Sequence, residues 1–362
     1  MAVFTNMPHL FEPLRIRGIE FAHRVLVSPM CQYSCLDGLA QEWHLVHLGS
    51  RAVGRAAAVI AEATAVTADG RISPVDLGLW TDAHAEPLER IFSFIAQQGA
   101  IPGIQLAHAG RKASTAEPWK GGKPLTPQQG GWMPIFAPSA IAFADGYSVP
   151  QALSEAEIRT VVQAFADAAR RAREAGAKLI EIHAAHGYLL NSFLSPLSNR
   201  RTDAYGGSFS NRTRLLCEVV TSVRKIWPEQ YPLFVRISAT DWSEGGWSVE
   251  DSVALAKILA PLGVDLFDCS SGGNVAGARI PLGPGYQVGF AEQIRRQAGM
   301  LTGAVGMITD PAQADPIVRT GQADLVFLAR QFLREPYWPL IAARVLGQDI
   351  QWPVQYERAK LK

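Results

Sequence analysis

Two histidines and a tyrosine lie within six residues, in the segment 183–188, which reads HAAHGY. Three chemistries suit this spacing. His183 and His186 can be structural residues, hydrogen-bonded in the core or at its rim. They can be two metal ligands, although an H-x-x-H pair without a neighbouring carboxylate or cysteine is a poor zinc site. They can also donate hydrogen bonds to an oxygen that gains negative charge during a reaction, and Tyr188 would then supply a proton as a general acid.

Other polar side chains end or interrupt short apolar runs elsewhere in the chain. Cys31 follows the run that ends in Ser28-Pro29-Met30, and Gln105 lies in the run that leads into the segment HAGR at 108–111. Arg236 lies inside a third run, and Arg330 closes a fourth. Residues so far apart in the sequence can share a site only if the fold brings the ends of these runs together.

Eight short runs rich in apolar and β-branched residues alternate with longer helical patterns. Several are apolar at consecutive positions, as in parallel strands that are covered on both faces. The predicted strands are Val25–Ser28, Ala58–Glu62, Gly103–Ala107, Leu179–His183, Leu233–Ile237, Leu266–Cys269, Leu301–Val305 and Leu325–Leu328. Strands that alternate with helices in this way predict an α/β fold, the (β/α)8 TIM barrel, with a doubly wound open sheet as the alternative.

The helical segments have recognisable ends. Ser154 with Glu157 three residues later is a capping box, and the helix that it begins would stop at Gly176. Ser248 and Asp251 predict a second helix start.

In a (β/α)8 barrel the catalytic groups come from the carboxyl ends of the strands. The polar side chains named above are therefore expected on one rim.

Three segments lie outside this alternation. Residues 14–21 alternate apolar and polar side chains around Gly18, which predicts a small hairpin that plugs the bottom of the barrel. Residues 110–150 are rich in Gly, Pro and Gln and follow the third strand, so they form either a lid or a plain loop. Residues 348–362 form a C-terminal tail. We expect residues 1–362 to form a single barrel domain.

Composition narrows the possible partners. Lys and Arg number 34 against 33 for Asp and Glu, and this balance argues against nucleic acid or an anionic membrane surface as a partner. The sequence shows no apolar run long enough to span a bilayer and no secretory signal. The four cysteines form no C-x-x-C pair, so neither a zinc ribbon nor an iron–sulfur cluster is expected. These features favour a cytoplasmic protein.

Two turns are candidates for holding a phosphate. The segment Gly303-Ala304-Val305-Gly306 covers the end of the seventh strand, and Ala329-Arg330 follows the eighth. Loops at these places in a barrel often hold a phosphate through backbone N–H groups and a short helix. The sequence contains neither a Walker A motif nor a strand–GxGxxG–helix unit.

Several separated blocks resemble the Old Yellow Enzyme family, which are flavin-dependent ene-reductases on a (β/α)8 barrel. The blocks are HAAHGYLL at 183–190, FLSP at 193–196, Asn199, Arg200, Asp203, YGGS at 205–208, Asn211-Arg212, PMCQY at 29–33, GIQLAHAGR at 103–111 and VGMI at 305–308. The similarity runs from about Leu10 to Arg358. Cys31 and the ending Tyr356-Glu357-Arg358 are typical of the thermophilic-like branch, which includes xenobiotic reductases.

The resemblance implies a tightly bound, non-covalent FMN and no metal. The residues implied to bind FMN are Ser28, Pro29, Met30, Cys31, Ala63, Gln105, Arg236, Gly306, Ala329 and Arg330, the last three at the phosphate. Arg236 would lie by the pyrimidine edge of the flavin, where a fixed cation favours the negative charge of the reduced ring. Gln105 would bind the same edge. Cys31 would lie near the reactive side of the flavin, tune its reduction potential and touch the substrate.

The resemblance also implies a reaction. NADPH or NADH would reduce FMN, and His183 and His186 would hold the oxygen of an α,β-unsaturated carbonyl compound or nitroalkene. Flavin N5 would give hydride to the β-carbon, and Tyr188 would protonate the α-carbon. Tyr33 would help to hold the oxygen end of the substrate. Arg358 would reach the site of a neighbouring subunit, so a homodimer or homotetramer is expected.

The sequence departs from the family pattern at two places, and its residues are also compatible with two other functions. Ala329 stands where relatives commonly have glycine, and the chain after Arg358 reads AKLK where the branch often has an aromatic residue. A metal-dependent lyase or hydrolase would use His183 and His186 as ligands, and a non-enzymatic barrel would bind without turnover. Relatives of the dienoyl-CoA reductase type need an iron–sulfur cysteine cluster, which this sequence does not contain.

Overall fold

The computed structural model describes residues 9–360. Eight parallel strands lie side by side in the order of the sequence, and the last strand pairs with the first, which closes the barrel. The strands are β3 (Val25–Val27), β4 (Ala58–Ala65), β5 (Ile101–Ala107), β8 (Leu179–Ala184), β9 (Leu233–Ser238), β10 (Leu266–Ser270), β11 (Leu301–Ala304) and β12 (Leu325–Leu328). The eight predicted strands and the barrel are confirmed, and ring closure rules out the open sheet.

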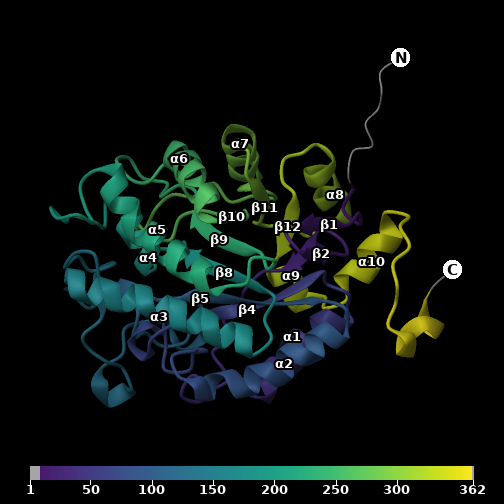
Figure 1. Ribbon diagram of the computed structural model, residues 1–362, viewed down its shortest axis with the longest axis horizontal. Helices are drawn as coiled ribbons and strands as arrows, with labels where there is room; N and C mark the ends of the chain where they lie inside the picture. The colour runs from purple at the N-terminus through teal and green to yellow at the C-terminus, as the bar shows by residue number, and fades with distance from the viewer. Residues whose placement is uncertain (1–8, 361–362) are drawn as a thin grey trace.

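Helices surround the barrel, as Figure 1 shows. They are α1 (Glu42–Val53), α2 (Ala85–Gln97), α3 (Glu155–Glu174), α4 (Leu189–Leu194), α5 (Phe209–Ile226), α6 (Val249–Leu259), α7 (Val288–Ala298), α8 (Pro311–Arg319), α9 (Arg330–Arg334) and α10 (Trp338–Val345). Short 3-10 turns cover Ala68–Gly70, Asp82–His84, Gly110–Lys112, Pro118–Lys120, Pro127–Gln129, Ala260–Leu262 and Val354–Ala359. Within the described residues no helix is long and apolar enough to cross a membrane.

The predicted capping box is present at the start of α3. The backbone N–H of Glu157 donates to the hydroxyl of Ser154, and the backbone N–H of Ser154 donates to the Glu157 carboxylate at 2.7 Å. Ser248 and Asp251 form the same arrangement at the start of α6. These reciprocal bonds satisfy backbone donors that a helix start otherwise leaves unpaired, so both helices begin where the sequence places them.

An N-terminal hairpin closes the bottom of the barrel. Strands β1 (Leu14–Ile16) and β2 (Ile19–Phe21) pair antiparallel. Ile16 and Phe21 pack in one buried cluster with Leu26, Leu179 and other residues from the amino ends of the barrel strands. The predicted plug is confirmed. Burial of this apolar layer leaves the opposite end of the barrel, where the strands finish, for polar side chains.

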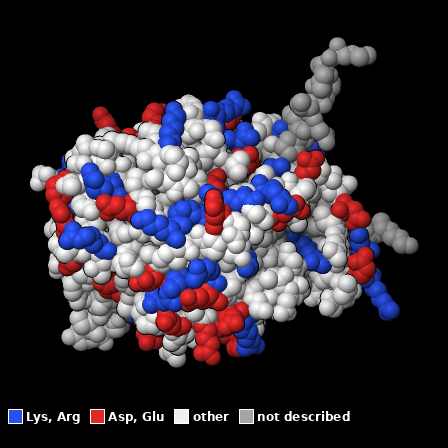
Figure 2. Space-filling view, in the orientation of Figure 1, with Lys and Arg blue, Asp and Glu red and all other residues white. Residues whose placement is uncertain are grey.

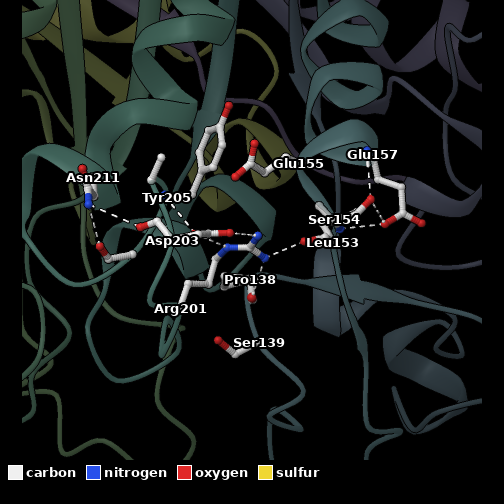
Figure 3. Close-up of polar contacts among 12 residues, drawn as sticks. Pro138, Ser139, Leu153, Ser154, Glu155, Glu157, Arg201, Asp203, Tyr205 and Asn211 are labelled. Carbon is white, nitrogen blue, oxygen red and sulfur yellow. Dashed lines mark hydrogen bonds and ion pairs between the residues drawn. The ribbon is translucent and has the colours of Figure 1, made fainter.

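Arg201 fixes the insertion 110–150 to the loop after β8, as Figure 3 shows. Its guanidinium donates to the backbone oxygens of Pro138 at 3.0 Å and Leu153 at 2.5 Å, and it forms an ion pair with Asp203. The insertion itself contains β6 (Phe136–Ala137), which pairs with β7 (Gln151–Ala152) just beyond it. Asp203, a residue of the family signature, therefore has a structural role here, because it pairs with the arginine that anchors the insertion. The lid remains a prediction.

The tail that begins at residue 348 runs beyond α10, at the edge of the molecule in Figure 1. Residues 1–8 and 361–362 of the predicted single domain and tail lie outside the described part of the chain.

On the face drawn in Figure 2, acidic and basic side chains are interspersed, with no large area of one sign. This distribution agrees with the formal net charge of +1.

Candidate active site

The end of β8 brings two histidines and a tyrosine together. His183 is near the end of the strand, His186 and Gly187 adopt left-handed backbone conformations with φ of 61° and 74°, and Tyr188 precedes α4. This turn folds the rings back on one another. The ring centroid of His183 lies 5.1 Å from that of His186 and 5.0 Å from that of Tyr188, in edge-to-face geometry.

Gly187 is required at this turn. A Cβ atom built on it would lie 2.3 Å from the backbone oxygen of Gly273, in the loop that follows β10. That distance is a steric clash with backbone, and the positive φ adds to the cost of any other residue. The turn is therefore fixed by contact with a neighbouring strand end.

Hydrogen bonds define which histidine nitrogens are available. The backbone N–H of Ala185 donates to Nδ1 of His183 at 3.3 Å, so the ring proton of His183 is on Nε2. Nε2 of His186 lies 2.7 Å from the hydroxyl of Ser270, so Nδ1 is the nitrogen of His186 that can serve a substrate. Burial lowers the pKa of both rings well below the usual range, and the neighbouring cations Arg236 and Lys112 lower it further. Both histidines are therefore neutral near pH 7.

Tyr188 keeps its proton in this environment. Burial raises its pKa well above the ordinary value of 10.0, and the nearby Cys31 and Tyr33 add to the shift. Its side chain is half-buried, and its hydroxyl forms no hydrogen bond with another described residue. A protonated phenol without a protein partner can donate to a bound molecule.

Cys31 and Tyr33 come from the loop after β3. Burial and the carboxylates of Asp76 and Glu62 raise the pKa of the Cys31 thiol well above its usual value, so Cys31 is a thiol rather than a thiolate. Burial also raises the pKa of Tyr33. The Tyr33 ring lies edge-on to the Trp119 ring, with centroids 5.6 Å apart. Trp119 belongs to the insertion, which therefore reaches this part of the molecule.

A polar group lies inside the barrel, just below the histidines. Nη1 of Arg236 donates to the Ser28 hydroxyl at 3.0 Å, and Nε of Arg236 lies 3.2 Å from a carboxylate oxygen of Asp268. The amide nitrogen of Gln105 donates to Glu181 at 2.7 Å. All five side chains are buried. This is unusual in a barrel interior, which branched apolar residues normally fill.

Sequence reasoning found only part of this polar group. It identified Ser28, Gln105 and Arg236 but missed Glu181 and Asp268, although each is an acidic residue inside an otherwise apolar strand run, IEI and FDC. An acidic residue inside an apolar strand is the signal that could have identified them, because a charged side chain is rarely buried unless it has a partner.

Lys112 was also missed. Its ammonium donates to the backbone oxygens of His186 and Gly273, each at 2.9 Å, and lies 5.4 Å from the ring centroid of Tyr188. Burial lowers the pKa of Lys112 to about 8, with a further contribution from Arg111. Lys112 thus joins the loops that follow β5, β8 and β10.

The remaining predicted cofactor residues lie at the ends of neighbouring strands. Ala63 pairs with Gln105 across β4 and β5. Gly306 has a φ of 121°, and a Cβ atom there would lie 2.8 Å from the amide nitrogen of Gln287. Ala329 and the exposed Arg330 stand where β12 passes into α9. Pro29 and Met30 are half-buried between Ser28 and Cys31.

Arg358 is the exception among the predicted site residues. It is exposed in the 3-10 turn Val354–Ala359 of the tail, beyond α10. The site at the strand ends is thus assembled within one chain without Arg358.

These residues fit FMN. The buried amide of Gln105, hydroxyl of Ser28 and guanidinium of Arg236 are donors that suit the oxygen- and nitrogen-bearing edge of a flavin. The glycine conformation at Gly306 and the exposed cation of Arg330 suit an anionic phosphate.

The histidine pair does not form a metal centre with the described residues. The one group of three potential ligands found there is Cys35, His44 and Glu62, whose ligand atoms lie within 4.8 Å of one another. Nδ1 of His44 accepts a hydrogen bond from the backbone N–H of Gln41 at 3.0 Å, so its Nε2 carries the proton and cannot ligate a metal. Neither His183 nor His186 has a third ligand nearby in this part of the chain.

Residues 9–347 match the NADH:flavin oxidoreductase / NADH oxidase family. The chain belongs to this family, the Old Yellow Enzymes. It is 52% identical over 351 residues to an NADPH dehydrogenase of Geobacillus sp. strain WCH70, a match that covers 96% of this chain and 98% of the relative. It is 48% identical over 351 residues to an NADPH dehydrogenase of Bacillus subtilis strain 168, with the same coverage of each chain.

Solved structures agree with this assignment. Morphinone reductase superposes with a TM-score of 0.78 at 27% sequence identity, covering 97% of this chain and 93% of its own. The protein is therefore an FMN-dependent NAD(P)H oxidoreductase of the Old Yellow Enzyme type. The metal-dependent lyase or hydrolase and the non-enzymatic barrel are excluded by this assignment.

Proposed function

We propose that the protein is an ene-reductase, which reduces the carbon–carbon double bond of an α,β-unsaturated carbonyl compound or a nitroalkene. The observation that carries this proposal is the pair of neutral histidines beside a protonated tyrosine. Two neutral N–H donors suit a carbonyl or nitro oxygen, and the phenol supplies the proton that the reaction consumes.

We assign the cofactor to the polar end of the barrel. Ser28, Gln105 and Arg236 would bind the flavin's pyrimidine edge with Pro29, Met30, Cys31 and Ala63 close by, and Gly306, Ala329 and Arg330 would hold its phosphate. Arg236 would favour the negative charge of the reduced ring, and Cys31, as a neutral thiol, would tune the reduction potential through contact and not through charge. Bound at these residues, FMN would supply the hydride chemistry between NAD(P)H and the β-carbon of the substrate.

His183 and His186 would bind the substrate oxygen. His183 donates from Nε2, because Nδ1 is an acceptor for the Ala185 N–H. For His186 we assign the tautomer with the proton on Nδ1, with the Ser270 hydroxyl donating to Nε2. Both hydrogen bonds strengthen as the oxygen gains negative charge, so the pair stabilises the transition state more than the bound substrate. Tyr33 would support the same oxygen.

Tyr188 would then give its phenolic proton to the α-carbon. Its hydroxyl is not committed to another described residue, and its ring is held against His183. Lys112 fixes the carbonyl of His186 and lies near the Tyr188 ring, so its charge favours the phenolate that is left behind.

We further propose a homodimer or homotetramer in the cytoplasm. The 3-10 turn Val354–Ala359, which contains the exposed Arg358, follows α10 at the edge of the molecule in Figure 1, so Arg358 would complete a site in a neighbouring subunit. Cys31, Cys35, Cys217 and Cys269 are all free thiols, which suits a reducing compartment.

The product identifies the reaction. Holoenzyme is reduced with NADPH in deuterium oxide and mixed anaerobically with an α-methyl cyclic enone. The proposal predicts a saturated ketone with solvent-derived deuterium at the α-carbon and a single configuration at that carbon at early times. Reoxidation by oxygen alone, with no product from enones or nitroalkenes, would contradict it.

A further inference from the structure

Two buried carboxyl groups below the predicted flavin position have no role in the function proposed above. Glu181 on β8 and Asp268 on β10 are completely buried. Glu181 opposes Gln105 across β5 and β8, and Asp268 opposes Arg236 across β9 and β10. Each carboxyl group therefore stands next to one of the two side chains assigned to the pyrimidine edge of FMN.

We propose that Glu181 and Asp268 are positioning residues for the flavin, and that Asp268, by pairing with Arg236, sets the reduction potential of bound FMN below the value that an unpaired arginine would give. This inference rests on the proposed position of Arg236 and Gln105 at the flavin, and it goes beyond that position by assigning what controls their orientation and charge.

Asp268 depends on Arg236 for its stabilisation. Its carboxylate lies 3.2 Å from Nε of Arg236, and neither of its oxygens accepts a hydrogen bond from another described residue. An ionised carboxylate in such a site needs its cation, because burial without a partner is very costly. The guanidinium is in turn held from two directions, since Nη1 donates to Ser28 on a strand that does not adjoin β10.

Glu181 acts on Gln105. Its Oε1 accepts from the Gln105 amide at 2.7 Å, while Oε2 is buried without a hydrogen-bond partner among the described residues. The amide nitrogen of Gln105 is thereby turned toward Glu181. The orientation of a glutamine amide decides whether it offers a donor or an acceptor to a ligand, so Glu181 fixes what Gln105 presents.

The two carboxyl groups differ in charge at neutral pH. Burial and the neighbouring Asp268 raise the pKa of Glu181 to about 8, against the opposing effects of Arg236 and Gln105. Burial raises the pKa of Asp268 to about 6, and Arg236 limits that rise. The ion pair with Arg236 at 3.2 Å favours the ionised form of Asp268, whereas Glu181, which forms no ion pair with a described residue, keeps its proton to a higher pH. Arg236 and Asp268 then have a net charge near zero.

This charge balance predicts the sign of a mutation. Reduction adds negative charge to the flavin, and a nearby positive charge stabilises the reduced form. Asp268→Asn keeps the shape but leaves Arg236 unopposed, so it should raise the potential. Glu181→Gln keeps a carbonyl oxygen for Gln105 and changes no charge at pH 7. Glu181→Gln is therefore the matched control for Asp268→Asn, because both variants replace a buried carboxyl group with an amide.

The test measures the midpoint potential of FMN in the holoenzymes at pH 7 by equilibration with a reference dye. For Asp268→Asn we expect affinity for reduced FMN to rise at least about tenfold relative to oxidised FMN, which is about 30 mV for a two-electron couple. Glu181→Gln should change that ratio less than about threefold. No rise in Asp268→Asn, or a larger shift in Glu181→Gln, would overturn the inference.

A second comparison covers the case in which Asp268→Asn does not retain FMN. Arg236→Gln alone leaves an unpaired carboxylate, whereas Arg236→Gln with Asp268→Asn leaves no buried charge in the pair. We expect the single variant to lower the potential and the double variant to recover part of the loss. Equal potentials in the two would overturn the role of Asp268. Unchanged FMN affinity and potential in Arg236→Gln would instead refute the proposed place of Arg236 at the flavin.

Discussion

Replacing Tyr188 with phenylalanine should separate the two halves of the catalytic cycle. The centroid of the Tyr188 ring lies 5.0 Å from the centroid of the His183 ring and 5.4 Å from the ammonium nitrogen of Lys112. Phenylalanine keeps these contacts. The hydroxyl has no hydrogen-bond partner among the described residues, so its loss should change the free energy of unfolding by less than about 0.5 kcal/mol.

The expected kinetic effect is large and confined to one step. A positioned general acid contributes about 100-fold to 10,000-fold to rate, which is about 3–5 kcal/mol of activation free energy. Stopped-flow spectroscopy of the Tyr188→Phe holoenzyme should show reduction by NADPH at the wild-type rate and reoxidation by an enone slowed at least about 100-fold. Because burial raises the pKa of Tyr188 well above 10.0, the wild-type phenol stays protonated between about pH 6 and 8.

Tyr33→Phe is the matched control, since it removes another hydroxyl from the same site. It should weaken enone binding more than it slows the step at saturating enone. Equal slowing of both half-reactions in Tyr188→Phe would refute the proton-donor role, and so would an unchanged rate of reoxidation.

Three further predictions test other parts of the structure. His183→Ala should weaken binding of a phenol to the oxidised holoenzyme by about tenfold or more in a spectroscopic titration, because a donor to the ligand oxygen is lost; an unchanged affinity would remove His183 from the substrate site. Arg201→Leu should make the insertion 110–150 more susceptible to thermolysin, because the bonds to two of its flanking backbone oxygens are lost, whereas the neighbouring exposed Arg200→Leu should not; equal cleavage of the two would contradict the anchoring role. Burial raises the pKa of Asp76 to about 7 from 3.8, and a carboxyl group with a raised folded-state pKa stabilises the fold at low pH and loses that contribution as pH rises through the folded-state pKa. In urea unfolding, the stability of wild type relative to Asp76→Asn should therefore fall by about 2 kcal/mol from pH 5 to 8. A constant difference would show that Asp76 is ionised throughout.

The sequence predicted the features that depend on residues close to one another along the chain. Each barrel strand is a short apolar run that ends at a turn, so the eight strands could be identified one at a time, and their alternation with helices predicted the barrel. His183, His186 and Tyr188 could be grouped for the same reason. They lie on one short turn, and the glycine between them permits the positive φ that brings the rings together.

Lys112 shows what could not be predicted in this way. Its partners are backbone oxygens of His186 and Gly273, on two other loops, and backbone atoms leave no residue-type signal in the sequence. The anchoring of the insertion by Arg201 has the same cause, because its partners there are the carbonyls of Pro138 and Leu153.

The sequence by itself therefore determined the barrel, its family and the residue types at the strand ends. The tertiary structure alone decided that Asp268 meets Arg236 and that Glu181 meets Gln105. The physical reason is that the tilt and register of strands in a closed barrel decide which inward side chains become neighbours. Burial in that interior then sets which of them carry charge, and neither quantity can be read from the spacing of residues along one strand.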